Sequence, residues 1–122
     1  MTFAYTENIA FNEEVIAYAT GAVAMSETLT PGYAFELKEV RLHLSAAGGT
    51  ASENFTITED AYEGAAYDAV HFSYDMETAS DVVQTYYNRE KHFGSGDALV
   101  FAFANANTRT WGLKVIYKLL PS

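Results

Sequence analysis

The chain has 122 residues, a length typical of one domain. Hydrophobic residues make up 49% of it and aromatic residues 15%, which excludes a mainly disordered chain. It contains no cysteine, so disulfides, thiolate metal sites and thiol catalysis are excluded. The 16 acidic and 7 basic residues give a net charge of −9, and no stretch approaches the roughly 20 apolar residues of a membrane span. We therefore expect neither nucleic acid nor a membrane as a partner.

Residues 1–32 are expected to form an N-terminal segment, made of strands or of an extended arm, that contacts partners. Its stretch from residue 14 to 19 fits a strand or a helix capped by Asn12, and neighbouring β-favouring residues such as Thr20 favour the strand. The first basic residue is Lys38, so we expect no secretory leader. The small and β-branched residues of this segment suit strand addition to a neighbouring protein. The candidate interface residues here are Val15, Ile16, Tyr18, Val23 and Met25.

The next apolar stretch reads as a strand whose phase changes midway. Phe35 and Leu37 share one face of an alternating strand, whereas Val40 and Leu42 share the other. Two interpretations remain open. One extra residue near Lys38 would restore a single buried face, as a β-bulge does, or the strand crosses from one sheet to another.

Period-two alternation continues through the rest of the body, residues 33–122. At Trp111–Leu119 one face is apolar and the other carries Lys114 and Lys118, which is typical of a half-buried antiparallel strand. Residues 68–76 show the same pattern, and we expect their apolar side chains to face the core and His71 to face outward. Further strands are expected at 54–58, 81–88 and 99–104.

Turn signals recur about every ten residues between these strands, which favours a sandwich or barrel. The sequence therefore predicts an all-β, single-domain antiparallel β-sandwich, jelly-roll-like, with about eight strands. At residues 94–97 we expect a hairpin turn in which Gly96 has a positive φ and Asp97 bonds the backbone through its carboxylate. The predicted core consists of Phe35, Leu37, Val40, Leu42, Leu44, Phe55, Ile57, Val70, Phe72, Tyr74, Leu99, Phe101, Phe103, Trp111, Leu113, Val115 and Tyr117.

No catalytic or cofactor signature is intact: the chain has no GxSxG, no HExxH and no phosphate-binding loop with its lysine. We therefore expect no enzyme activity, no catalytic residue, no cofactor and no metal ligand. His43 and His71 are expected on solvent-facing sheet faces. The acidic stretch containing Glu59, Asp60, Glu63 and Asp68 fits a calcium-binding loop, but an ordinary solvated loop explains it better.

The aromatic residues give the best indication of a binding surface. Tyr86 and Tyr87 are adjacent in an expected strand, so they face opposite sides and at least one is exposed or in an interface. Both are candidate interface residues. Tyr62 and Tyr67 suit a sugar-stacking platform, whereas Trp111 lies on the apolar face of its strand and is expected in the core.

Several runs then resemble one family. The stretch from Phe35 to Ser45 with the glycine-rich break after it, Gly96–Val100, Asn105–Asn107 and Trp111–Val115 are similar to small β-sandwich virion proteins of tailed bacteriophages, of the capsid decoration or cement type. The resemblance spans about residues 35–119 and implies a non-enzymatic protein that coats or joins parts of the particle.

The resemblance implies a definite location and partner. The protein is expected in the virion, assembled in the host cytoplasm, bound to the major capsid protein or to other virion proteins. It is expected to form a homo-oligomer, of which a trimer is one form. Alternative functions are a tail, neck or baseplate component, a carbohydrate-binding module for host attachment and, last, a small hydrolase on the same scaffold. Fold analogy alone does not choose among them.

Overall fold

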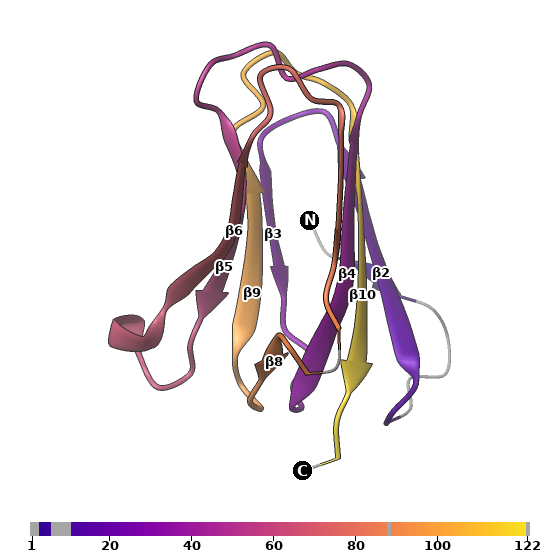
Figure 1. The fold of residues 1–122 in the computed structure, drawn as a ribbon, viewed down its shortest axis with the longest axis vertical. Coiled ribbons are helices and arrows are strands. Elements are labelled where there is room, and N and C mark those ends of the chain that lie inside the picture. Colours follow the sequence, from indigo (N-terminus) through magenta and orange to yellow (C-terminus); the bar gives the residue numbers. More distant parts are fainter. Residues whose placement is uncertain (1–2, 6–10, 88, 122) are drawn as a thin grey trace.

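A computed structural model describes residues 3–5, 11–87 and 89–121 (Figure 1). Its elements are almost all strands, as the alternating pattern predicts. In the described residues no helix has the length and apolar character needed to cross a membrane. The elements are β1 (Ala4–Tyr5), β2 (Glu14–Gly21), β3 (Met25–Leu29), β4 (Phe35–Leu44), β5 (Asn54–Asp60), the short helix η1 (Ala65–Tyr67), β6 (Ala69–Asp75), β7 (Asp81–Thr85), β8 (His92–Phe93), β9 (Ala98–Phe103) and β10 (Trp111–Leu119).

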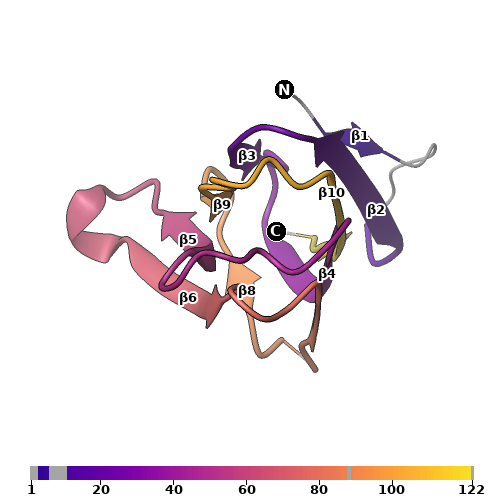
Figure 2. The same cartoon turned by 90° about the horizontal axis from the view of Figure 1, so that it is seen from above.

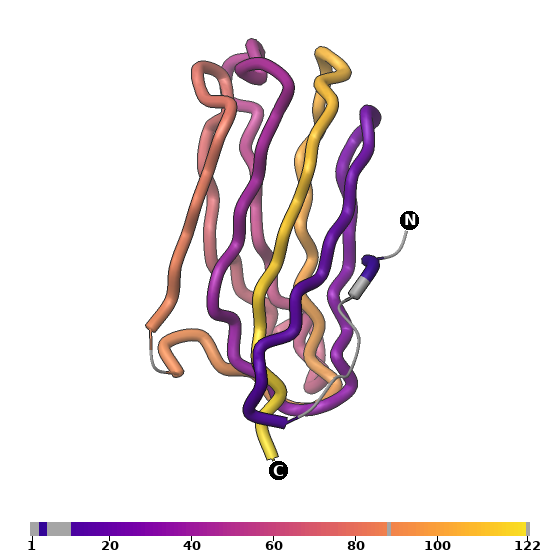
Figure 3. Tube along the Cα trace, turned by 90° about the vertical axis from the view of Figure 1, so that its right-hand side faces the viewer, coloured from indigo at the N-terminus to yellow at the C-terminus, as the bar shows by residue number. Residues whose placement is uncertain are grey.

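The strands form two antiparallel sheets that pack face to face (Figures 1 and 2). Sheet A has the order β1-β2-β10-β4-β7, with β8 also paired to β4, and Figure 3 looks onto it. Sheet B has the order β3-β9-β5-β6. Without the two-residue strands β1 and β8, eight strands pair from the outside of the sequence inward: β2 with β10, β3 with β9, β4 with β7 and β5 with β6. This is one long hairpin rolled up on itself, the jelly roll that the sequence predicts.

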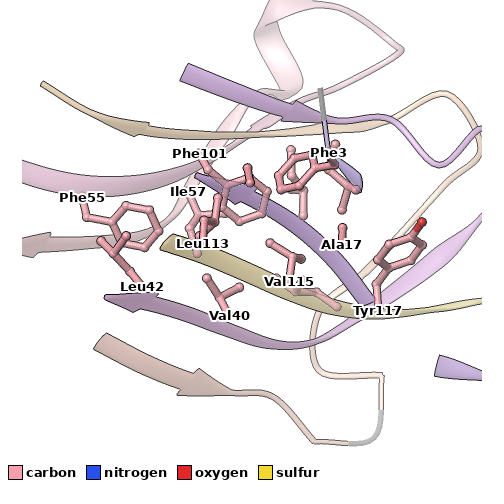
Figure 4. Close-up of a cluster of buried hydrophobic side chains, with 14 of the residues drawn as sticks. Phe3, Ala17, Val40, Leu42, Phe55, Ile57, Phe101, Leu113, Val115 and Tyr117 are labelled. Carbon is pink, nitrogen blue, oxygen red and sulfur yellow. The ribbon is translucent and has the colours of Figure 1, made fainter. Parts of the chain in front are cut away.

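The core lies between the sheets and comes from alternate positions of the long strands. In β10 every second residue from Trp111 to Leu119 is buried. Phe55, Ile57 and Phe101 from sheet B face Leu42, Leu113 and Val115 from sheet A, as Figure 4 shows. Burial of side chains of this kind stabilises the fold by about 1.5–3 kcal/mol each.

The phase change in β4 is a β-bulge, one of the two interpretations left open by the sequence. Glu39 pairs with Ile116 and Leu37 pairs with Tyr117, so Lys38 is the extra residue. Because of it, Leu37 and Val40 both point into the core although they differ in parity. The strand stays in one sheet over its whole length.

The N-terminal segment supplies strands to both sheets. β2 pairs with β10 from Glu14 to Gly21, so the strand interpretation of this stretch is confirmed and the helix is excluded. β3 pairs with β9 in sheet B. Over these two strands the segment is therefore part of the sandwich rather than an arm outside it. Residues 1–2 and 6–10 lie outside the described part of the chain.

The predicted core is confirmed except in β6. Fourteen of its 17 positions are buried, and the three exceptions, Val70, Phe72 and Tyr74, all belong to one strand. Val70 is 63% exposed and Tyr74 is 48% exposed, while Phe72 is partly buried against the core. The bulge at His71 turns Val70 to the outer face of sheet B, opposite Thr58. Tyr74, in contrast, stays on the face of Phe55 and is only partly covered by the described strands. The prediction that Val70 and Tyr74 lie in the core is therefore wrong.

The turn before β9 has the predicted chemistry but not the predicted connection. Gly96 has φ +94°, and the Asp97 carboxylate accepts a hydrogen bond from the Gly94 amide at 2.8 Å. However, the turn does not close a hairpin, because β8 pairs with β4 in sheet A and β9 lies in sheet B. It carries the chain from one sheet to the other.

Candidate docking surface

Four of the ten exposed large apolar side chains in the described residues lie on the β5–β6 hairpin, which extends away from sheet A (Figures 1 and 2). Every residue of β6 is exposed or half-buried. In the loop that joins the two strands, Tyr62 is 75% exposed and Tyr67 is 66% exposed. Together with Val70 and Tyr74 they form what we call the uncovered hairpin. Apolar groups grouped in this way are typical of interaction sites.

The aromatic side chains of β6 continue the core outward. Phe72 contacts Phe55 edge to face at 6.1 Å between ring centroids, and Tyr74 stacks on Phe72 at 6.4 Å. The core is thus connected to the surface through a row of rings, Phe55, Phe72 and Tyr74. A partner that covers Tyr74 would extend this row without rearrangement of the sandwich.

The backbone of β6 is also unpaired on one side, since it is the last strand of sheet B. The Met76 amide donates to the Glu53 carbonyl at 3.1 Å, which marks Met76 and Glu53 as a hydrogen-bonded pair. Because inward and outward bonding alternates along an antiparallel strand, Tyr74 and Phe72 also bond toward β5. Ser73 and Asp75 therefore direct their amide and carbonyl groups outward, where a further strand can accept and donate hydrogen bonds.

Of the other edge strands, β3, β1 and β8 are protected in ways that β6 is not, whereas β7, the last strand of sheet A, is a five-residue edge that also has no lysine and no proline. β3, the opposite edge of sheet B, turns the Glu27 carboxylate inward, and this side chain is buried with one oxygen unpartnered. Inward charges on edge strands prevent a further strand from adding. β1 and β8 have only two residues each. In contrast, β6 has seven residues, no proline and no lysine, and its one irregularity is a bulge.

That bulge places His71 between the sheets. Thr58 pairs with Val70 and Ile57 with Phe72, so His71 is the extra residue. Its ring packs edge to face on Phe93 at 5.2 Å. The prediction that His71 faces outward is therefore wrong, because simple alternation does not anticipate an extra residue.

His71 holds the hairpin to the loop before β8. Its Nε2 lies 2.8 Å from Glu59 Oε1, and its Nδ1 lies 3.2 Å from Lys91 Nζ. An ammonium group can only donate, so Nδ1 accepts and the Nε2–H donates to Glu59. Both ring nitrogens are thus hydrogen-bonded within the chain.

A second histidine contact lies on the exposed side of sheet A. His43 Nδ1 and Asp81 Oδ1 are 2.6 Å apart, and the Ser80 hydroxyl donates to the other Asp81 oxygen at 2.9 Å. In a Ser-His-Asp triad the serine bonds to the histidine, whereas here it bonds to the carboxylate. The hydrogen bonds from His43 and then from Ser80 hold the pKa of Asp81 below its ordinary value.

The acidic loop at the hairpin tip uses its carboxylates to hold the backbone. Asp68 accepts from the Ala61 amide at 2.8 Å, and Asp97 accepts from the Tyr62 amide at 2.9 Å. In the described part of the chain no three histidine, aspartate or glutamate side chains are grouped as metal ligands. The loop is therefore tied to the β8–β9 turn, and the Tyr62 ring lies against Gly96.

The seven interface residues expected from the sequence do not form one surface. Val15, Met25 and Tyr86 are buried in the core cluster, so a partner cannot reach them in the folded chain. Burial, and then the negative charge of Glu90, raise the pKa of the Tyr86 phenol. Ile16 is half-buried. The exposed residues are Tyr18, Val23 and Tyr87, which lie on or near different strands.

Two aromatic expectations are nevertheless confirmed. Tyr86 is 5% exposed and Tyr87 is 74% exposed, so these neighbours do face opposite sides. Trp111 is buried, and its Nε1–H donates to the Val23 carbonyl at 2.8 Å, which removes it from any sugar-stacking platform. The sequence did not single out Val70 and Tyr74 as surface residues, because their alternation is the same as that of a core strand.

The chain matches no known protein family, and no curated protein sequence matches it.

Proposed function

We propose that this protein is a non-enzymatic structural subunit of a tailed-phage virion, a capsid decoration protein that attaches to the major capsid protein through the uncovered hairpin. The observation that carries the proposal is that four exposed large apolar side chains lie together on one hairpin: Tyr62, Tyr67, Val70 and Tyr74. The resemblance of residues 35–119 to such virion proteins supplies the type of assembly.

Physical features of the chain support this kind of role. Tyr62 and Tyr67 present large, half-apolar side chains of the type enriched in protein interfaces. The net charge of −9 keeps the protein away from packaged nucleic acid, as suits a subunit on the outside of a shell. The two histidines that contact carboxylates belong to structural hydrogen-bond pairs. The proposal therefore assigns the surface to binding and no residue to catalysis.

The test is a binding titration with virus shells that lack this protein. We expect saturable, stoichiometric binding by the parent chain and at least a tenfold weaker affinity for Tyr67→Asp, because the charge would be desolvated in the contact. Val83→Asp is the matched control, since Val83 is equally exposed but lies on β7. Saturable binding to tails, necks or baseplates instead would retain the virion role and change the location. No binding to any virion part would refute the proposal.

A second candidate is a carbohydrate-binding module for host attachment. It is favoured by two tyrosines, Tyr62 and Tyr67, in one loop that is open to solvent. Binding to host surface polysaccharide, weakened by Tyr62→Ala and Tyr67→Ala, without binding to shells would establish this function in place of the first.

A further inference from the structure

We propose that the free edge of β6 pairs with β6 of a second copy of this chain, antiparallel and around a two-fold axis at Ser73. The inference rests on the proposed function in that it names an occupant for part of the uncovered hairpin. It leaves Tyr62 and Tyr67, in the loop beyond the strand, free for the shell. The result is a sheet that continues from one sandwich into the other.

The backbone of β6 fixes which residues can bond across such an axis. Ser73 and Asp75 direct their amide and carbonyl groups away from β5, as the bond from the Met76 amide to the Glu53 carbonyl requires. With the axis at Ser73, this residue faces its own copy, and the two exchange both of their backbone hydrogen bonds. Asp75 then lies opposite His71 of the second copy.

The side chains are complementary in the same register. A two-fold axis perpendicular to the sheet keeps the two apolar faces on the same side. Because the axis passes through Ser73, residues whose numbers sum to 146 lie opposite each other. Phe72 therefore faces Tyr74 of the second copy, and the pair occurs twice. Aromatic pairs across antiparallel strands contribute favourably, and this pair covers the exposed part of Tyr74.

Neighbouring registers fit less well. An axis at Phe72 places the bulge residue His71 in both central hydrogen-bonded pairs. An axis at Tyr74 places Phe72 opposite Met76, which is fully buried in its own chain. The Ser73 register is centred on the regular residues Phe72, Ser73 and Tyr74 in both copies, and it brings the bulge residue His71 only into the outer pairs, opposite Asp75.

Charge does not oppose this contact despite the net charge of −9. Asp75 is the only acidic residue within β6, and its two oxygens accept hydrogen bonds from the Ser52 and Glu77 amides at 3.2 and 3.0 Å. In the proposed register no carboxylate lies directly opposite another. The strand also projects beyond the part of the sandwich that sheet A covers, which leaves room for a second copy (Figure 2).

A single cysteine provides a direct test, because the natural chain has none. Residues in a hydrogen-bonded antiparallel pair have Cα atoms about 5.5 Å apart, which suits a disulfide. Under mild oxidation Ser73→Cys should form a covalent dimer at least ten times faster than Val83→Cys, an exposed position on β7. A rate equal to that of the control would overturn the proposal.

Analytical ultracentrifugation of the parent chain and of Ser73→Pro gives an independent measurement. Since the Ser73 amide makes no bond to β5 and its hydroxyl accepts one exposed bond, from Asn54 Nδ2 at 2.8 Å, proline there should lower the melting temperature only slightly and weaken dimerisation at least tenfold. A parent chain that stays monomeric at its highest soluble concentration would overturn the inference. Shell binding by that monomer would still support the proposed function. A dimer that binds no shell would contradict the proposed function and leave the pairing through β6 intact.

Discussion

Strands β10 and β6 carry the same sequence pattern and have opposite surroundings. Each alternates apolar and other residues with a period of two, and each was expected to face the core. β10 lies between β2 and β4 and has five buried residues in alternation. β6 is paired on one side only and has none.

The difference shows what alternation reports. It indicates that one face of a strand is apolar, but not which surface covers that face. In β10 the cover is sheet B of the same chain. In β6 the described part of the chain supplies only a partial cover, at Phe72. Exposed apolar surface of this kind is typical of sites that bind a partner.

The largest expected effect is at the first residue of β10. Trp111→Ala should lower the free energy of unfolding by about 3–5 kcal/mol, because the ring is buried and its Nε1–H bond to the Val23 carbonyl is lost. Urea denaturation measures this. A loss below about 1 kcal/mol would mean that the two sheets do not pack around this ring.

A matched pair of valines tests the comparison itself. Val115→Ala in β10 should cost about 2 kcal/mol, since it removes two buried methyl-sized groups and leaves a cavity. Val70→Ala in β6 should change stability by less than about 0.5 kcal/mol, because its side chain is mostly in solvent. Equal losses in the two variants would show that β6 is covered within the monomer.

Substitutions at two glycines with positive φ test whether the Tyr62 ring of the hairpin packs against the β8–β9 turn. Gly32→Ala should lower the free energy of unfolding by about 1 kcal/mol through backbone strain alone, since no atom lies within 4 Å of the added Cβ. Gly96→Ala should cost about 1 kcal/mol more, because the Cβ would lie 2.8 Å from Tyr62 Cδ1. Thermal unfolding of both variants gives the difference. Identical melting temperatures would place Tyr62 away from the turn.

The smallest effect concerns β7, the edge strand of sheet A. Hydrogen bonds from His43 and Ser80 lower the pKa of Asp81 in the folded chain, so its contribution to stability is present above the unfolded pKa and is lost as pH falls through the folded one. The stability difference between the parent and Asp81→Asn should be present above the ordinary aspartate pKa of about 3.9 and should shrink as the pH falls below it. A difference independent of pH would exclude an ionised Asp81 as its source.

Much of the fold follows from local patterns in the sequence. The phase change near Lys38 follows from two apolar pairs of opposite parity, although the pattern left a bulge and a crossing between sheets open, and the jelly roll follows from eight short strands with regular turns. Both features involve residues that are buried within the folded chain. The geometry of the turn at Gly96 was predicted because the bond that Asp97 accepts from the Gly94 amide is local, whereas its bond from the distant Tyr62 amide was not predicted.

The rest depended on contacts between distant strands. His71 turns inward because of a bulge whose cause lies in the pairing with β5. Val15 and Met25 look like surface residues only when β2 and β3 are considered apart from β10 and β9. The exposure of Tyr74 follows from the position of β6 at the end of a sheet, which no local pattern reports.

Amide hydrogen exchange along β6 tests most directly whether this strand is reserved for a partner. In dilute solution the Ser73 and Asp75 amides should exchange freely while those inside β10 stay protected. At high protein concentration, Ser73 should gain at least tenfold protection as the two β6 edges pair. Strong protection of Ser73 at every concentration would mean that the monomer already covers this edge. No gain at any concentration would contradict pairing through it.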